Sequence, residues 1–256
     1  MALRIVYLAT ADARGHLMRA QLLVHALRAA GATVEALTTA DAGRDFLLAF
    51  GIDAPILSRH YAVQFDTRQN MLREATDRNV AHYVFRPSRM LRDIAQLRPL
   101  LRRADLIIND SFHPALLVMG ALPGWRRKVV HVYGGSLRQA LVDNFAGRLP
   151  RLAARAFGAI IGSMIEAARG SIEHDFASDF TTESATNSAT AAQARRYRLP
   201  TPIPVIGEPP PGGAADAAIY LNPHFRDAAL AHALSAGLDA AGLTAHRVGE
   251  GYAGDG

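Results

Sequence analysis

Apolar positions in the first half of the chain form short continuous runs that alternate with longer segments of helical spacing. The run Arg4–Ala9 is apolar after one charge, as in a central strand of a parallel sheet. Apolar residues then recur at helical spacing over residues 17–30, and Gly31 can end that helix. Residues 33–37 form a second apolar run. The start of the chain therefore predicts a βαβ unit.

The same alternation continues to about residue 135. Further strands are predicted at residues 55–57, 105–109 and 129–133. Further helices are predicted at residues 41–50, 80–103 and 114–122, the long one interrupted or kinked near Pro87 or Pro99. Strands alternating with helices predict an α/β fold, a doubly wound parallel sheet with helices on both faces.

The second half is less regular and suggests a second domain. We expect a helix over residues 148–168, and loop plus a weak helix over residues 171–197. Residues 199–216 are rich in Pro and Gly, which is a linker composition. One more strand–helix–strand unit follows at residues 217–221, 227–241 and 244–248. These observations predict an N-terminal domain over residues 1–198, a linker over 199–216, and a partial second βαβ unit over 217–256.

Composition excludes some classes of chemistry. Half of the 256 residues are hydrophobic, enough to bury a core, and no cysteine is present. Disulfides, thiolate metal sites and cysteine nucleophiles are therefore excluded. The histidines show no metal-ligand spacing, so we predict no metal and no cofactor. No apolar run reaches the roughly 18 residues of a membrane span, and we expect a cytoplasmic protein.

The formal net charge of +5 leaves the class of partner open. It could attract anionic partners such as nucleotide sugars or a membrane surface, or it could simply keep the surface solvated. Arginines of the long predicted helix form a basic face with the same two interpretations, one being peripheral contact with the inner face of the membrane. These are Arg86, Arg89, Arg92, Arg98, Arg102 and Arg103. We expect no nucleic-acid partner.

Two polar side chains are predicted to meet at the carboxyl edge of the sheet. His16 follows the first strand, and Asp110 follows the strand at residues 105–109. In doubly wound sheets these two strands are commonly neighbours, and ligands sit outside the carboxyl ends of the strands. An imidazole held by a carboxylate is a good general base. The alternative is that His16 and Asp110 only cap their helices.

The opening of the chain resembles that of glycosyltransferases with the GT-B fold. The matching features are a strand, the Gly15-His16 loop, a helix and the pattern Val34-Glu35-Ala36-Leu37-Thr38. The family includes the UDP-sugar-dependent transferases of small molecules and the N-acetylglucosaminyltransferase of peptidoglycan synthesis. The resemblance covers residues 3–135 well and residues 217–249 loosely.

The resemblance implies roles for the two edge residues. In the small-molecule transferases the loop histidine is the catalytic base and an aspartate orients it, in a context matched here by Asn109-Asp110-Ser111-Phe112. The implied reaction is inverting transfer from a nucleotide sugar to a hydroxyl acceptor, with His16 and Asp110 as catalytic residues. The candidate substrate-binding residues are Gly15, Arg19, Ser111, Gly134, Gly135 and Ser136.

The chain also departs from that family. The nucleotide sugar is bound there by a C-terminal domain with a Gly-rich loop and an acidic residue, and this donor-binding motif is not present here. We therefore expect residues 217–256 to be the beginning of a nucleotide-sugar-binding domain that is incomplete in this chain. Two other functions stay open: a nucleotide-sugar epimerase of the same fold, and a non-catalytic acceptor-binding or auxiliary partner protein.

Overall fold

The computed structural model divides the chain into two compact units. One comprises Met1–Ala62 and Ala81–Pro204, and the other comprises Val63–Val80 and Val205–Gly256. The structure describes residues 2–11, 14–58, 72, 74–75, 78–79, 82–83, 86–135, 137, 150–175, 195–202, 216–220 and 228–248. Within those residues, no helix has the length and apolar character needed to cross a membrane.

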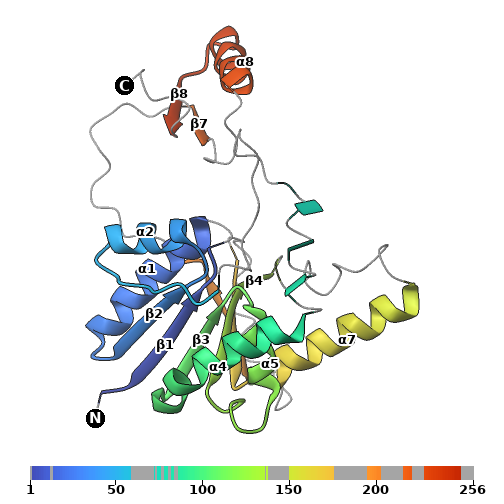
Figure 1. Cartoon of the computed structure of the whole chain (residues 1–256). Helices are drawn as coiled ribbons and strands as arrows, with labels where there is room; N and C mark the ends of the chain where they lie inside the picture. The colour runs from blue at the N-terminus through green and yellow to red at the C-terminus, as the bar shows by residue number, and fades with distance from the viewer. Residues whose placement is uncertain are drawn as a thin grey trace, which may run out of the picture. The chain divides into compact units, whose positions relative to one another are not determined.

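The first unit contains a six-stranded parallel sheet with the strand order β2-β1-β3-β4-β5-β6 (Figure 1). The strands are β1 (Arg4–Ala9), β2 (Thr33–Thr38), β3 (Leu106–Asp110), β4 (Val129–Gly134), β5 (Gly170–Asp175) and β6 (Arg196–Pro200). The order reverses between β1 and β3, which is the switch point of a doubly wound sheet. The predicted fold class is confirmed.

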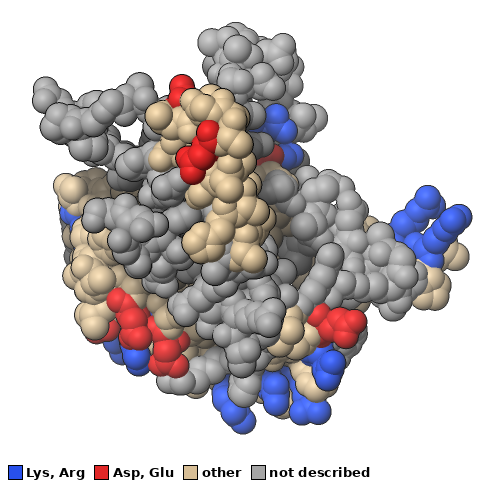
Figure 2. Space-filling view, turned by 90° about the horizontal axis from the view of Figure 1, so that it is seen from above, with Lys and Arg blue, Asp and Glu red and all other residues tan. Residues whose placement is uncertain are grey.

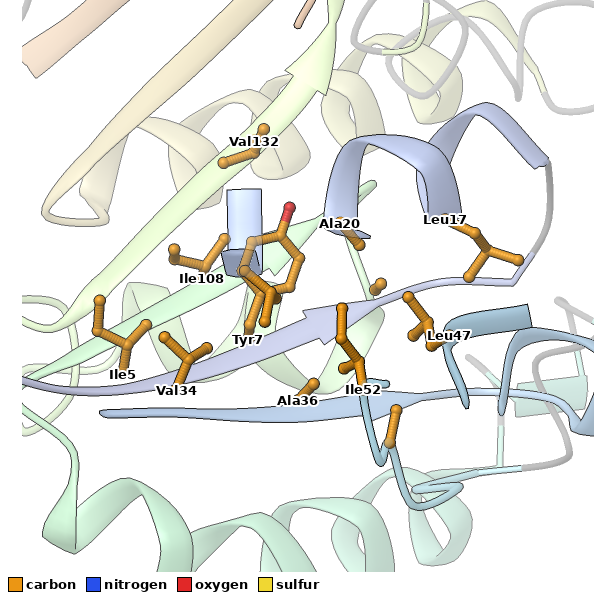
Figure 3. Packing of buried hydrophobic residues seen from close by; sticks show 13 residues of the cluster. Ile5, Tyr7, Leu17, Ala20, Val34, Ala36, Leu47, Ile52, Ile108 and Val132 are labelled. Atoms are coloured by element: carbon orange, nitrogen blue, oxygen red, sulfur yellow. The ribbon is translucent and has the colours of Figure 1, made fainter. Parts of the chain in front are cut away.

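Helices cover both faces of this sheet. They are α1 (Arg14–Ala29), α2 (Asp41–Ala49), α4 (Pro87–Arg103), α5 (Pro114–Ala121) and α7 (Arg151–Ala167). Tyr7 and Ala9 of β1 pack in one hydrophobic cluster with residues of α1 and α2 (Figure 3). Val6 and Leu8 pack in a second cluster with residues of α4 and α5. Successive side chains of a strand point to opposite faces, so a strand buried on both faces must be apolar throughout.

Several predicted boundaries differ from the structure. Helix α4 begins at Pro87, where proline is favoured in the first turn; residues 82 and 83 before it are helical and Arg86 is not, so the predicted long helix is interrupted near Pro87. Pro99 lies inside α4. The predicted strand at residues 55–57 is reduced to a single bridge between Thr38 and Ile56. The main elements of residues 4–134 otherwise lie where the hydrophobic pattern predicts them.

The prediction of loop and weak helix over residues 171–197 was wrong at both ends. Gly170–Asp175 forms β5, which pairs with β4, and Arg196–Pro200 forms β6 at the edge of the sheet. Four of the five residues of β6 are exposed, so this strand carries no apolar alternation that a sequence could reveal. The strand also extends into the segment predicted as a linker.

The second unit contains a two-stranded parallel sheet. Its elements are β7 (Ala217–Tyr220), α8 (Ala228–Ala240) and β8 (Ala245–Val248). The predicted strand–helix–strand unit is thus present. Asp216 and Thr244 precede the two strands and exchange hydrogen bonds: the amide of Thr244 donates to Asp216 Oδ2 at 2.9 Å, and the amide of Asp216 donates to Thr244 Oγ1 at 3.2 Å.

Charged side chains of both signs share the surface. Along the lower margin of Figure 2, both acidic and basic side chains are present. The arginines of α4 at positions 92, 98, 102 and 103 are exposed. Peripheral membrane contact by this helix stays a prediction.

Candidate active site

A buried polar cluster lies at the carboxyl edge of the six-stranded sheet, where β1 and β3 end side by side. These strands pair in parallel with Ala9 opposite Asp110. Thr10 follows β1, and α1 begins soon after it at Arg14. Because β1 and β3 are neighbours, the start of α1 and the end of β3 meet at this edge, as the sequence predicts.

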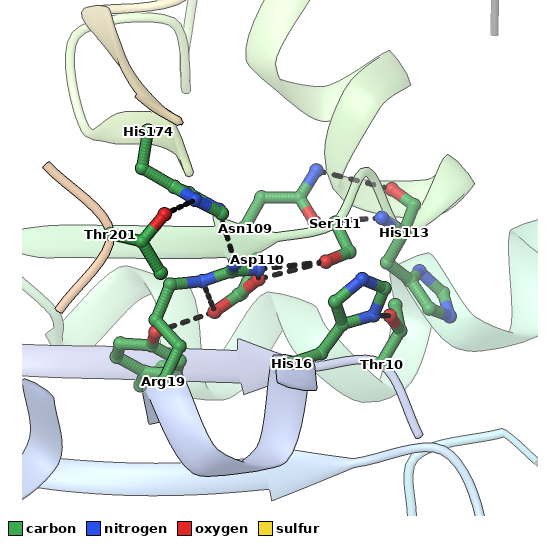
Figure 4. Close-up of polar contacts among 10 residues, drawn as sticks. Thr10, His16, Arg19, Asn109, Asp110, Ser111, His113, His174 and Thr201 are labelled. Carbon is green, nitrogen blue, oxygen red and sulfur yellow. Dashed lines mark hydrogen bonds and ion pairs between the residues drawn. The ribbon is translucent and has the colours of Figure 1, made fainter. Parts of the chain in front are cut away.

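Asp110 is the centre of the cluster and is fully buried. Its Oδ2 accepts hydrogen bonds from Tyr7 Oη at 2.6 Å and Arg19 Nε at 3.0 Å. Its Oδ1 accepts from the Ser111 hydroxyl at 2.9 Å and from a terminal nitrogen of Arg19 (Figure 4). Burial, and then the Asp110 charge, raise the pKa of Tyr7 well above its ordinary value, so its phenol stays protonated and donates.

Arg19 ties Asp110 to the neighbouring part of the sheet. Its side chain is 5% exposed, and one terminal nitrogen also donates to Ser111 Oγ at 3.1 Å. The other terminal nitrogen contacts Nε2 of His174 on β5. An arginine can only donate, so His174 Nε2 must be the acceptor and Nδ1 carries the proton. His174 Nδ1 then donates to Thr201 Oγ1 at 3.1 Å.

His16 lies beside this ion pair on the first turn of α1. Its Nδ1 is 3.3 Å from the hydroxyl of Thr10, which is fully buried. Burial lowers the pKa of His16, the Asp110 carboxylate opposes this effect, and the Arg19 guanidinium adds to it. The ordinary pKa of histidine is about 6.5. His16 is therefore a neutral imidazole at pH 7 and can accept a proton.

His16 and Asp110 share one edge of the sheet and interact electrostatically. Among the described residues the hydrogen-bond partner of His16 is Thr10, and those of Asp110 are Tyr7, Arg19 and Ser111. In place of the direct imidazole–carboxylate hydrogen bond of a dyad, His16 contacts Thr10 and the Asp110 carboxylate binds three other side chains. The catalytic dyad stays a prediction.

The turn after Asp110 has an uncommon backbone. Ser111 and Phe112 have φ angles of 66° and 61°, a left-handed region that costs about 1–2 kcal/mol for residues with a Cβ. The Ser111 amide donates to Val132 O at 2.9 Å, and the Phe112 ring stacks on Tyr133 with centroids 4.5 Å apart. Strained backbone is retained where the surroundings enforce it, and it is common at functional sites.

A second set of buried polar side chains supports this turn through hydrogen bonds. The Asn109 side chain accepts from the His113 amide at 2.8 Å and donates toward Nδ1 of His131 at 3.2 Å. His113 Nδ1 in turn caps α5 by accepting from the Ala115 amide at 3.3 Å. Burial lowers the pKa of both His113 and His131 to about 3. These histidines are neutral structural groups and not proton carriers.

Comparisons with known proteins address the fold. The glycotransferase of kitacinnamycin superposes with a TM-score of 0.56 at 16% identity, over 96% of this chain. The fold is therefore glycosyltransferase-like, of the GT-B kind. The glycosyltransferase SnogD from Streptomyces nogalater matches 86% of this chain and 60% of its own length with a TM-score of 0.45 at 19% identity.

The glycosyltransferase-like fold is recognised in structure alone. No protein-family model matches the chain. No curated protein matches it significantly in sequence. The chain spans 65% of the length of the kitacinnamycin glycotransferase.

The predicted substrate-binding residues occupy different environments in this glycosyltransferase-like fold. Gly15 is exposed on the first turn of α1, and Gly134 ends β4 beside His174, followed by Gly135. Arg19 and Ser111, each 4% exposed as a whole residue, are hydrogen-bonded to Asp110. Ser136 lies outside the described residues.

Four cluster residues escaped the sequence analysis: Tyr7, Thr10, His174 and Thr201. In the hydrophobic pattern Tyr7 cannot be told from the other apolar residues of its strand, and His174 lies in a strand that this pattern did not predict. The position of Thr10, directly after β1, is the one signal that could have identified its role.

Proposed function

We propose that this protein transfers a sugar from a nucleotide-sugar donor to a hydroxyl acceptor with inversion, using His16 as general base and Asp110 as its electrostatic partner. The observation that carries the proposal is a neutral, partly buried imidazole beside a buried carboxylate, at the carboxyl edge of the sheet of a glycosyltransferase-like fold. Ligands of open α/β sheets bind at this edge.

The proposed reaction is a single displacement. The acceptor hydroxyl gives its proton to His16, and its oxygen forms a bond to the anomeric carbon of the sugar. The bond from that carbon to the diphosphate oxygen breaks, and the nucleoside diphosphate leaves with the electron pair. Attack opposite the leaving group inverts the anomeric configuration. Alignment supplies most of the rate, and the base adds about a hundred- to ten-thousandfold.

The Asp110 carboxylate stabilises the imidazolium formed in this step through its charge. The charge acts without a hydrogen bond, because Asp110 already opposes the loss of basicity that burial imposes on His16. Gly15, Gly134 and Gly135 are the proposed substrate-contacting positions along the same edge, and Ser136, the next residue in the sequence, is proposed as a fourth.

The test is consumption of nucleotide sugars by the full chain with hydroxyl acceptors, in wild type and in His16→Gln. We expect His16→Gln to lower the rate at least a hundredfold, because glutamine cannot accept the proton. His25→Gln is the matched control, since His25 is an exposed histidine on the same helix. Equal rates for His16→Gln and wild type would contradict the role of His16.

Two further measurements separate the alternative functions. An epimerase converts a nucleotide sugar without any acceptor, so product formed from donor alone would favour it. A binding module would bind an acceptor without consuming donor. Calorimetry that detects no nucleotide-sugar binding at millimolar concentration would favour that interpretation.

A further inference from the structure

The carboxylate of Asp110 has no hydrogen-bonding capacity left for His16. An ionised carboxylate offers about four acceptor positions. Tyr7 and Ser111 occupy one each, and Arg19 occupies two. Each of these donors is buried, so releasing one of them to admit His16 would leave a polar group without its partner.

The charge of Asp110 still acts on His16, but Arg19 offsets part of its effect. Arg19 forms a side-on ion pair with Asp110 within hydrogen-bond distance. A carboxylate that serves a catalytic histidine fixes its tautomer and stabilises the imidazolium. Here burial lowers the pKa of His16, the Asp110 carboxylate opposes this, and the Arg19 guanidinium adds to the lowering. His16 is therefore a weaker base than a histidine held directly by an unpaired carboxylate.

Thr10, rather than a carboxylate, makes the hydrogen bond that orients the His16 ring. For Nε2 of His16 to accept a proton, Nδ1 must carry the hydrogen and donate it to Thr10 Oγ1, 3.3 Å away. In Figure 4 the other ring nitrogen lies on the side of the imidazole away from Thr10. A hydroxyl can hold the ring in this orientation. Because it is neutral, it gives an imidazolium little stabilisation compared with a carboxylate.

We infer that the acceptor carries an acidic hydroxyl, phenolic or enolic, rather than an aliphatic one, and that Thr10 is the positioning residue of His16. The inference rests on the proposed function and adds the acceptor class to it. A phenol ionises near pKa 10, as tyrosine does, whereas an aliphatic hydroxyl is about as weakly acidic as water, and its pKa is far higher. A weak base removes a proton more readily from the more acidic hydroxyl, which is the phenolic or enolic one.

The acceptor class is tested with phenol and benzyl alcohol, which share the aromatic ring but differ in hydroxyl acidity. Both are given to the full chain with the same nucleotide sugar, and the loss of donor is followed. We expect kcat/KM to be about a hundredfold greater for phenol, the lower range of general-base effects. Equal values, or a preference for benzyl alcohol, would overturn the acceptor class and leave the proposed transfer intact. Consumption of no donor with any acceptor contradicts the proposed function itself.

The role of Thr10 is tested with Thr10→Val, Thr10→Ser and the exposed control Thr33→Val. We expect Thr10→Val to lower kcat roughly ten- to a hundredfold with little change in KM, because the imidazole is no longer held in line. Thr10→Ser restores the hydroxyl and should restore kcat, and Thr33→Val should match wild type.

A nitrogen NMR measurement of the His16 tautomer provides a readout that a purely structural role would not move. In wild type the proton should reside on Nδ1, and in folded Thr10→Val this preference should be lost. An unchanged tautomer together with an unchanged kcat would remove Thr10 from the proposal.

Discussion

The guanidinium of Arg19 binds the carboxylate of Asp110 side-on, with Nε 3.0 Å from Oδ2 and a terminal nitrogen against Oδ1. The side chains are 5% and 0% exposed. This pair joins α1 to the end of β3 at the switch point of the sheet. It also limits the hydrogen bonds open to His16, because a lone pair of Asp110 that accepts from Arg19 cannot also accept from His16.

Removing Arg19 should destabilise the protein more than removing both charges. In Arg19→Met the Asp110 carboxylate is buried without its cation, which costs about 3–5 kcal/mol. The double variant Arg19→Met/Asp110→Asn removes the uncompensated charge and should recover a large part of that loss. Urea unfolding followed by circular dichroism measures both. Equal stability of the single and double variants would show that the carboxylate does not depend on Arg19.

Ser111 should be a position where glycine is more stable than alanine. Both substitutions remove the hydroxyl that binds Asp110 and Arg19. Glycine also relieves the left-handed backbone at φ 66°, which costs about 1–2 kcal/mol for a residue with a Cβ. We expect Ser111→Gly to exceed Ser111→Ala by about 1 kcal/mol in the free energy of unfolding. The opposite order would mean that the turn is not strained.

Gly43 should not tolerate a methyl group. A Cβ there would lie 2.4 Å from Thr38 Oγ1 and 2.8 Å from Ala11 Cβ, so α2 would have to shift away from β2 and the end of β1. Overpacking of this kind costs about 1–3 kcal/mol. Gly162 of α7 is the matched control, because a Cβ there meets nothing within 4 Å and alanine favours the helix by about 1 kcal/mol. Thermal unfolding should place the two variants on opposite sides of wild type.

His131 should make the protein sensitive to acid. Its pKa is about 3 in the folded chain and about 6.5 when unfolded, so below pH 6.5 the unfolded state binds the additional proton. Its contribution to stability is complete above pH 6.5 and falls by about 1.4 kcal/mol per pH unit as the pH decreases toward 3.

The pH effect is measured from urea unfolding between pH 7 and pH 4. We expect His131→Gln to reduce the slope of the unfolding free energy against pH by the contribution of one proton. A wild-type slope in His131→Gln would indicate that this histidine is not buried as a neutral group.

The hydrophobic pattern was enough to predict the central strands. A strand such as Arg4–Ala9 is buried on both faces, so its sequence must be apolar, and that requirement can be read without a structure. The edge of the sheet carries no such requirement. Arg196–Pro200 is mostly exposed and pairs through its backbone, which every sequence has, so β6 leaves no signal of its own.

The sequence by itself determined that His16 and Asp110 would lie at one edge, because parallel strands end on the same side of a sheet. Only the tertiary structure decided which side chain binds Asp110. Arg19 lies one turn beyond His16 on the same helix. Which of the two side chains binds the carboxylate depends on which one comes within hydrogen-bond distance of it. Spacing along a chain contains no such distances, because the packing of α1 against the sheet sets them.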